Sequence, residues 1–204
     1  YGFLNECASQ TEAGKALVDR LAATIRAEDS GRLVSFACNM VDSDISSASV
    51  DLVAFNAYPG TIPATPGTPA QLKEKVERRF TSAIARFRKL YPDKPIMVSE
   101  SGCGGLYGMH DPNASINTEE YQEEYLRDIL ECLWANSDCS GFAIWQMNDG
   151  RTRERFCDRS CSAMFGGSIA GCYDQFRRPK RSVETISQFF RRAWTKRGEQ
   201  EADR

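Results

Sequence analysis

The stretch KPIMVSES, residues 94–101, is a compact apolar run that ends in a carboxylate, Glu100. Short continuous apolar runs bounded by turn residues are typical of fully buried strands. The chain holds four more segments of this kind, YGFLNE (1–6), RLVSFACN (32–39), DLVAFNAY (51–58) and GFAIWQM (141–147). The sequence therefore predicts five strands, the first of which opens the chain in mid-strand.

Amphipathic segments alternate with these strands, and apolar residues at helical spacing mark their buried faces. Capping-box spacing at Ser9–Glu12 and at Thr68–Gln71 predicts two helix starts, and Asn117 with Glu120 opens a third helix. The expected stripes are Leu17, Leu21 and Ile25; then Leu72, Val76, Phe80, Ile84 and Phe87; then Tyr121, Tyr125, Ile129 and Leu133, with Trp134 also in the core. A last helix is expected around Val183 to Trp194.

Buried strands that alternate with helices imply a parallel sheet covered by helices. A doubly wound sheet and a (β/α) barrel both fit, but no glycine-rich phosphate loop follows any strand. Polar side chains stand just past the strand ends, which in a barrel converge on one mouth. They are Asn5, Glu6, Asn39, Asn56, Tyr58, Glu100, Trp145 and Asp149.

We therefore expect an α/β fold of the (β/α)8 TIM-barrel type, present as strands 4–8 with their helices. A closed barrel needs eight strands, so the first three are expected upstream of Tyr1, where the natural N-terminus is missing. Residues 1–195 would form this partial barrel. Residues 196–204 are charged and are expected to be a disordered tail.

Composition excludes several classes of protein. The 26 basic and 28 acidic residues nearly cancel, so no nucleic acid or membrane surface is expected as a partner. No apolar stretch reaches the ~20 residues of a membrane span. The eight cysteines form no CxxC pair, and no metal or cofactor is expected. Cys157, Cys161 and Cys172 share one loop region, and the sequence is compatible there with a disulfide and with free thiols. It does not indicate whether the protein is cytoplasmic or secreted.

Glu6 and Glu100 each end a predicted strand. Two carboxyl groups that face each other across a cleft are the minimum set of catalytic groups for glycoside hydrolysis, because one must carry a proton and the other must be ionised. A glutamate at a strand end is more often structural or solvated, so the surroundings matter. Asn5 adds an amide, Tyr58 a phenol and Trp145 an aromatic platform of the kind on which sugars stack.

Six motifs in order carry a family resemblance: FLNE, DLVAFNAY, KPIMVSESG, GMHDP…TEEYQEEYL, GFAIWQMND and GCYDQFRRPK. The series resembles glycoside hydrolase family 2, which includes β-galactosidases, β-glucuronidases and β-mannosidases. The resemblance runs from Tyr1 to about Trp194. It implies a retaining exo-β-glycosidase with a two-carboxylate double-displacement mechanism and a β-linked carbohydrate substrate.

The resemblance also implies roles for single residues. Glu6 would be the general acid/base and Glu100 the nucleophile, roughly 5–5.5 Å apart. Asn5 would bind the 2-hydroxyl of the sugar, and Tyr58 would hydrogen-bond the nucleophile. Asn56 would support its strand end, and Trp145 would form the floor of the sugar subsite.

The chain departs from the family pattern at one place, and two other functions stay open. β-Glucuronidases of the family carry an Asn-Lys pair where this chain has Ile169-Ala170, although Arg177 and Arg178 could offer another anion contact. The alternatives are an endo-acting β-glycanase of the same clan and a non-catalytic carbohydrate-binding or interaction protein. A partial barrel exposes two sheet edges, so a homo-oligomer or another partner is also expected.

Overall fold

The computed structural model describes residues 1–60, 69–151 and 167–202. The chain divides into two compact units. Unit 1 comprises Tyr1–Pro59, Glu77–Ser101 and Cys132–Ile144, and unit 2 comprises Gly60–Val76, Gly102–Glu131 and Trp145–Arg204. The elements are β1 (Gly2–Asn5), α1 (Glu12–Glu28), β2 (Ser35–Cys38), η1 (Ser46–Ser49), β3 (Val53–Asn56), α2 (Pro69–Leu90), β4 (Ile96–Ser101), α3 (Glu119–Ala135), β5 (Cys139–Ile144), β6 (Gly150–Arg151), β7 (Gly167–Ser168) and α5 (Ser182–Ala202).

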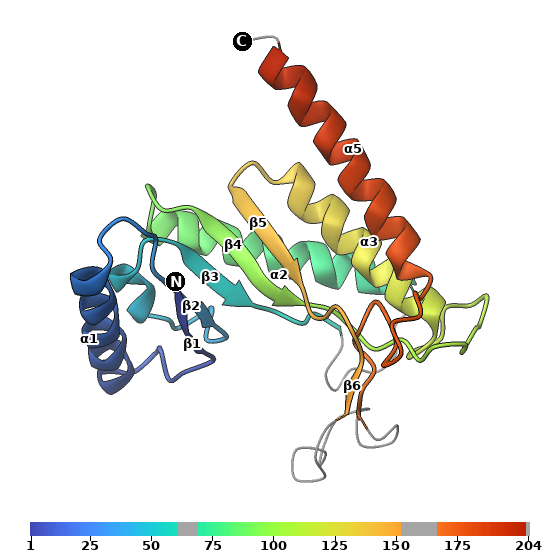
Figure 1. Ribbon diagram of the computed structural model, residues 1–204, viewed down its shortest axis with the longest axis horizontal. Helices are drawn as coiled ribbons and strands as arrows, with labels where there is room; N and C mark the ends of the chain where they lie inside the picture. The colour runs from blue at the N-terminus through green and yellow to red at the C-terminus, as the bar shows by residue number, and fades with distance from the viewer. Residues whose placement is uncertain (61–68, 152–166, 203–204) are drawn as a thin grey trace. The chain divides into compact units, whose positions relative to one another are not determined.

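Unit 1 is built on a five-stranded parallel sheet in the order β1-β2-β3-β4-β5 (Figure 1). The predicted α/β fold with a parallel sheet is confirmed, and each strand lies within or overlaps its predicted segment. The register pairs Asn5 with Ala37 and Asn56 with Glu100. The carboxyl ends of neighbouring strands are thereby aligned, which brings their terminal side chains to one edge of the sheet.

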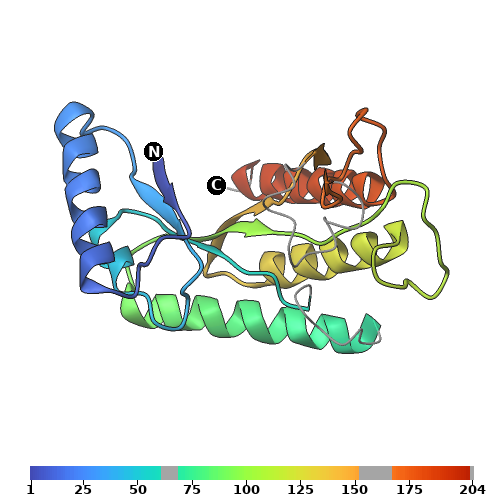
Figure 2. The ribbon, with the colours of Figure 1, turned by 90° about the horizontal axis from the view of Figure 1, so that it is seen from below.

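Aromatic side chains join α2 to the sheet. Phe55 of β3 lies 6.4 Å from Phe80 and 5.5 Å from Phe87, measured between ring centroids. All three side chains are fully buried, as the stripe predicted for this helix requires. Figure 2 shows α2 running along the strands and α1 beside the amino-terminal ones.

Helix α1 buries a different face from the predicted one. Gly14, Val18 and Ala22 are buried, whereas Leu17 is 36% exposed. The cause is a close approach at Gly14, where an added Cβ would meet the carbonyl oxygen of Ala8 at 2.0 Å. This contact turns the row of residues at i, i+4 and i+8 from Gly14 inward. The predicted stripe of Leu17, Leu21 and Ile25 is therefore wrong.

The helix caps also differ from the predicted ones. Thr11, not Ser9, caps α1, since its Oγ1 accepts a hydrogen bond from Gly14 N at 3.0 Å. Ser9 is instead fully buried, 3.3 Å from Cys38 Sγ. At the start of α3, Thr118 Oγ1 accepts from Tyr121 N at 3.2 Å, so Asn117 is not the cap. Trp134 is 53% exposed, so its expected place in the core is wrong.

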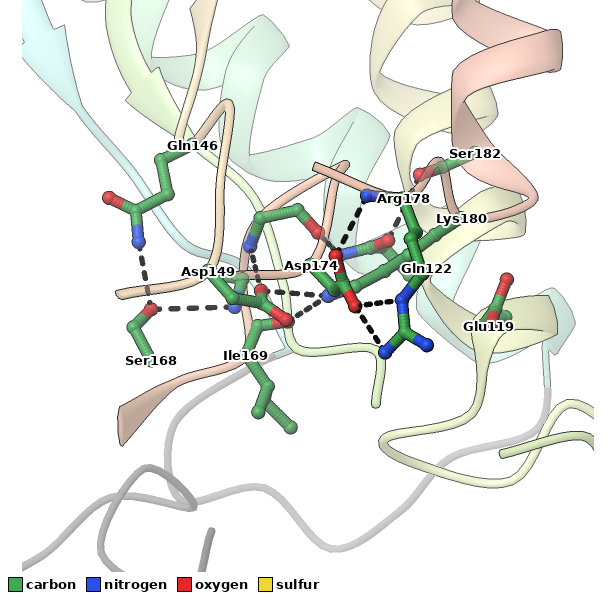
Figure 3. Close-up of polar contacts among 12 residues, drawn as sticks. Glu119, Gln122, Gln146, Asp149, Ser168, Ile169, Asp174, Arg178, Lys180 and Ser182 are labelled. Atoms are coloured by element: carbon green, nitrogen blue, oxygen red, sulfur yellow. Dashed lines mark hydrogen bonds and ion pairs between the residues drawn. The ribbon is translucent and has the colours of Figure 1, made fainter. Parts of the chain in front are cut away.

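Unit 2 is centred on Gln122 of α3, whose side chain is fully buried (Figure 3). Its Nε2 donates to the carbonyl oxygens of Cys103 and Gly171, and its Oε1 accepts from Ser182 Oγ. One amide thus ties three separate segments of unit 2 together. Cys172 is a buried free thiol, whereas Cys157 and Cys161 lie outside the described residues.

Helix α5 runs to Ala202, well past the end predicted near Trp194. The added residues are mostly Lys, Arg, Glu, Gln and Ala, which favour helix, and no proline stops them. The segment 196–202, predicted to be a disordered tail, is therefore helical as far as the structure describes it.

Candidate active site

Glu6 lies directly after β1, at the carboxyl edge of the sheet in unit 1. Its backbone N–H donates to Ala37 O at 2.8 Å, which extends the pairing of β1 with β2 by one residue. Its φ of +50° lies in the left-handed region, uncommon for a residue other than glycine. Asn5 and Glu6 are both exposed, so the side chains at this strand end face solvent.

The Glu6 carboxylate is held by amides from the two following strands. Asn56 Nδ2 donates to Glu6 Oε1 at 2.9 Å and also to Asn5 Oδ1 at 3.0 Å. Asn39 Nδ2, at the end of β2, donates to Glu6 Oε2 at 3.3 Å. The amides of the neighbouring strands thus hold the Glu6 side chain in place.

Ser99 and Asn39 are two members of this cluster that the motifs did not single out as site residues. Ser99 Oγ donates to Asn56 Oδ1 at 2.7 Å, which orients the Asn56 amide towards Glu6. Asn39 had one signal in the sequence, its place directly after a strand. Ser99 had none, because it stands inside β4, between Val98 and Glu100, and not after a strand end.

Glu100 lies in β4, and Tyr58 follows β3. Tyr58 Oη donates to Glu100 Oε2 at 2.8 Å. Burial, this hydrogen bond and the negative charges of Glu100 and Glu6 raise the pKa of Tyr58 well above its ordinary value. The phenol therefore stays protonated around neutral pH and keeps donating its hydrogen bond to Glu100.

Five of the six residues expected in a site lie in unit 1. Asn5, Glu6, Asn56, Tyr58 and Glu100 are joined by the hydrogen bonds above and by the shared effect of both carboxylates on Tyr58. Trp145 is the first residue after β5 and belongs to unit 2. The unit 1 cluster is polar and carries two carboxylates, which suits acid/base and nucleophilic chemistry.

Trp145 is 44% exposed and its backbone is tightly held within unit 2. An added Cβ on Gly102 would meet Trp145 O at 1.8 Å, so this position requires glycine. The next residue, Gln146, donates its N–H to Ala170 O at 3.1 Å, and the Trp145–Gln146 peptide bond is cis. The indole thus stands on a segment with a defined backbone.

A buried ion pair anchors the segment that follows Trp145 (Figure 3). Lys180, whose side chain is fully buried, donates to Asp149 Oδ1 at 2.8 Å and to Ile169 O at 3.0 Å. Gly171 N donates to the same oxygen of Asp149. Burial raises the pKa of Asp149, and the ammonium of Lys180 acts in the opposite direction.

Replacement of Lys180 by Met is expected to lower the free energy of unfolding by roughly 3 kcal/mol, because it leaves the Asp149 carboxylate buried without its counter-ion. Chemical denaturation followed by circular dichroism measures the change. The exposed Lys89, replaced by Met, is the matched control and should change little. Equal midpoints for the two variants would contradict a structural role for the pair.

Arg178 does not offer the free anion contact that was considered from the sequence. Its Nε donates to Asp174 Oδ2 at 2.6 Å, and its guanidinium lies 4.1 Å from the ring centroid of Tyr107. Arg178, Asp174 and Tyr107 all line a cavity of about 200 Å³ in unit 2. The guanidinium charge is therefore already compensated inside the unit.

Residues 1–60, 69–151 and 167–202 contain no group of three His, Cys, Asp or Glu side chains placed to hold a metal ion. No described helix is both long and apolar enough to span a bilayer.

Similar proteins point to one class of enzyme, the glycoside hydrolases. The β-glucuronidase of Rattus norvegicus is 26% identical over 179 residues, which are 86% of this chain and 26% of that protein. A family 2 β-galacturonidase from Eisenbergiella tayi, solved bound to galacturonate, superposes with a TM-score of 0.82 at 29% identity, over 93% of this chain and 32% of that one. No family model matches the chain.

A β-glucuronidase from Dictyoglomus thermophilum has the same fold, with a TM-score of 0.79 at 22% identity over 91% of this chain. The chain spans about a third or less of the length of these proteins. The resemblance to glycoside hydrolase family 2 is confirmed: the chain is a relative of hydrolases of glycosidic bonds and matches one part of them.

Proposed function

We propose that the chain forms strands 4–8 of a (β/α)8 catalytic barrel in a retaining exo-β-glycosidase, with residues 1–195 making up this part. The parallel order of β1 to β5, in sequence order, supports the proposal, because a barrel repeats that arrangement. So does the gathering of polar side chains at the carboxyl edge of the sheet, where barrel enzymes place their active sites.

In the proposed reaction Glu100 is the nucleophile and Glu6 the general acid/base. Glu100 attacks the anomeric carbon as the glycosidic C–O bond breaks, and Glu6 gives its proton to the leaving oxygen. Glu6 then takes a proton from water, whose oxygen displaces Glu100 and releases the sugar. The observation that carries the proposal is Tyr58, which donates to Glu100 and whose pKa is raised by burial, by this hydrogen bond and by the charges of both glutamates.

The remaining site residues bind the sugar in this proposal. Asn5 Oδ1 accepts from Asn56, which leaves the exposed Asn5 amide to donate to the 2-hydroxyl. Asn56 supports the end of β3, with its own oxygen held by Ser99. Trp145, which belongs to unit 2, is expected from the sequence to form the floor of the sugar subsite, and this role stays a prediction.

β-Linked uronides are the substrates proposed first, because the named relatives are glucuronidases and a galacturonidase. The protein that contains this chain is assayed on nitrophenyl β-glycosides of glucuronic acid, galacturonic acid, galactose, glucose and mannose. Turnover of one of them, with the β-anomer of the sugar formed first by NMR, is the expected result. Inversion at the anomeric carbon, or no turnover of any, overturns the proposal.

The same assays separate the two alternative functions. Release of oligosaccharides from a β-glycan, with no turnover of the small glycosides, would favour an endo-acting glycanase. Binding of a uronic acid in calorimetry with no turnover of glycosides or glycans would favour a non-catalytic carbohydrate-binding protein.

Replacement of Tyr58 by Phe is expected to lower kcat by roughly 10- to 100-fold, because Glu100 loses the hydrogen bond that orients it. KM should change less, since in this proposal the phenol acts on Glu100 and not on the sugar. Steady-state kinetics measures both. The exposed Tyr107 of unit 2, replaced by Phe, is the control. A Tyr58 variant with the wild-type kcat would contradict the proposed orientation of the nucleophile.

A further inference from the structure

The two oxygens of Glu6 face amides of different character. Asn56 is fixed, because its Oδ1 accepts from Ser99 and its Nδ2 donates both to Asn5 and to Glu6 Oε1. Rotating this amide would break the bonds to Asn5 and Glu6 and set two oxygen acceptors against each other. Asn56 can therefore only donate to Oε1, whatever the protonation state of Glu6.

Asn39 is not fixed in this way. Its Nδ2 donates to Glu6 Oε2 at 3.3 Å, near the long end of the hydrogen-bond range. Its Oδ1 is buried and finds no hydrogen-bond partner among the described residues. A buried acceptor without a partner costs about 1–3 kcal/mol, which offsets part of what the bond to Glu6 contributes in this orientation. Half a turn about the terminal bond exchanges the oxygen and the nitrogen.

The fixed amide decides which oxygen of Glu6 carries the proton. A carboxylic acid has one O–H, and a proton on Oε1 would meet the N–H of Asn56. The proton therefore belongs on Oε2, the oxygen that faces Asn39. There an N–H of Asn39 would oppose it, whereas the rotated amide would present its oxygen as an acceptor.

We propose that Asn39 is a positioning residue for the acid/base Glu6, and that its amide inverts as Glu6 gains and loses its proton. Towards the ionised carboxylate Asn39 donates from Nδ2 to Oε2, as the structure has it. Towards the protonated form the rotated Oδ1 accepts from the Oε2 hydroxyl and holds it until a glycosidic oxygen takes the proton. The inference rests on the proposed function, in which Glu6 is the acid/base.

The other titratable groups around Glu6 come from the neighbouring strands. Tyr58 and Glu100 lie at the ends of β3 and in β4, and both glutamates act on Tyr58. Cys7 follows Glu6 in the chain, with its thiol pKa raised mainly by burial. A substitution at Asn39 removes none of these groups, and Asn39 contacts Glu6 directly, so the limb that the proposed function assigns to Glu6 is the one that should move.

The test is the pH dependence of kcat/KM for the protein that contains this chain, with Asn39→Asp. The aspartate has the same shape, but when ionised it only accepts and adds a like charge. It should move the alkaline limb, the titration of Glu6, up by about one pH unit. Ser137→Asp is the matched control, because it adds the same charge on the exposed loop before β5, at the opposite end of the strands. That control should leave the limb in place.

A second variant, Asn39→Leu, removes both the donor and the acceptor without adding charge. It should lower kcat/KM about tenfold for a glycoside with a poor leaving group and little for a dinitrophenyl glycoside, which needs almost no protonation. This measurement tests the positioning role of Asn39 even if the aspartate variant does not fold. A limb that stays in place in Asn39→Asp, or an equal loss on both substrates in Asn39→Leu, overturns the inference.

The proposed function fails in a different way. If Glu6→Gln keeps the alkaline limb of the wild type, Glu6 is not the acid and the proposed function is overturned. If Glu6→Gln loses the limb while the Asn39 variants behave like wild type, the acid/base role stands and only the role of Asn39 is overturned.

Discussion

Replacement of Glu100 by Gln is expected to lower kcat/KM by at least about 10³-fold on every substrate, because an amide cannot form the covalent bond to the anomeric carbon. The substitution keeps the size of the side chain, and the one oxygen of Gln can take the place of Oε2, which accepts from Tyr58. The fold should therefore persist, and the loss should appear in kcat. Steady-state kinetics on the best nitrophenyl glycoside measures it.

Glu28→Gln is the matched control, since Glu28 is an exposed glutamate at the end of α1. Azide added to a Glu100→Ala variant gives a second readout. Azide can attack the anomeric carbon from the vacated side and expel the nitrophenolate, which yields a glycosyl azide of inverted configuration. A Glu100→Gln variant that keeps most of the wild-type activity would show that this carboxylate is structural.

The sheet was predictable because its signal is strong and local. Each predicted strand is a short apolar run next to polar residues; β3 ends at Asn56, and Glu100 is the last residue but one of β4. Continuous apolar strands separated by helices leave few arrangements other than a parallel sheet. The stripe of α2 followed for the same reason, since Val76, Phe80 and Ile84 are all large and all buried.

The orientation of α1 was not predictable from the periodicity of its apolar residues. Two neighbouring rows of the helix compete, and the row of Leu17, Leu21 and Ile25 is the more hydrophobic. The buried row contains Gly14 and Ala22, which add little to the hydrophobicity of the row. Gly14 lets the helix backbone approach the carbonyl group of Ala8 closely. Close approach depends on the partner segment at Ala8, so no pattern within the helix contains it.

The candidate site divides in the same way. The sequence predicted the site residues that stand at strand ends, because polar groups of these types are unusual directly after a buried strand. They are Asn5, Glu6, Asn56, Tyr58 and Glu100. Ser99 acts only through Asn56, across from β4 to β3. Such a contact depends on the register of two strands, which spacing along one chain does not specify.

Replacement of Glu6 by Gln is expected to lower kcat/KM by an amount that depends on the leaving group of the substrate. An amide cannot give up a proton to the glycosidic oxygen, so kcat/KM should fall by about 10²- to 10⁴-fold for alkyl or sugar leaving groups. Dinitrophenolate leaves without protonation, so kcat/KM for its glycoside should change little. Asn39 and Asn56 can still contact the amide of Gln, which keeps the side chain in its place.

The second half of the reaction exposes the other role of Glu6. Water must lose a proton as it attacks the glycosyl-enzyme, and Gln cannot accept it. The dinitrophenyl glycoside should therefore give a rapid burst of one dinitrophenolate per active site, followed by slow turnover. Stopped-flow absorbance measures the burst, and Glu12→Gln, at an exposed position in the first turn of α1, is the control. An equal loss on good and poor leaving groups, with no burst, would contradict the role of Glu6 as acid and base, because an acid is needed only where the leaving oxygen is basic.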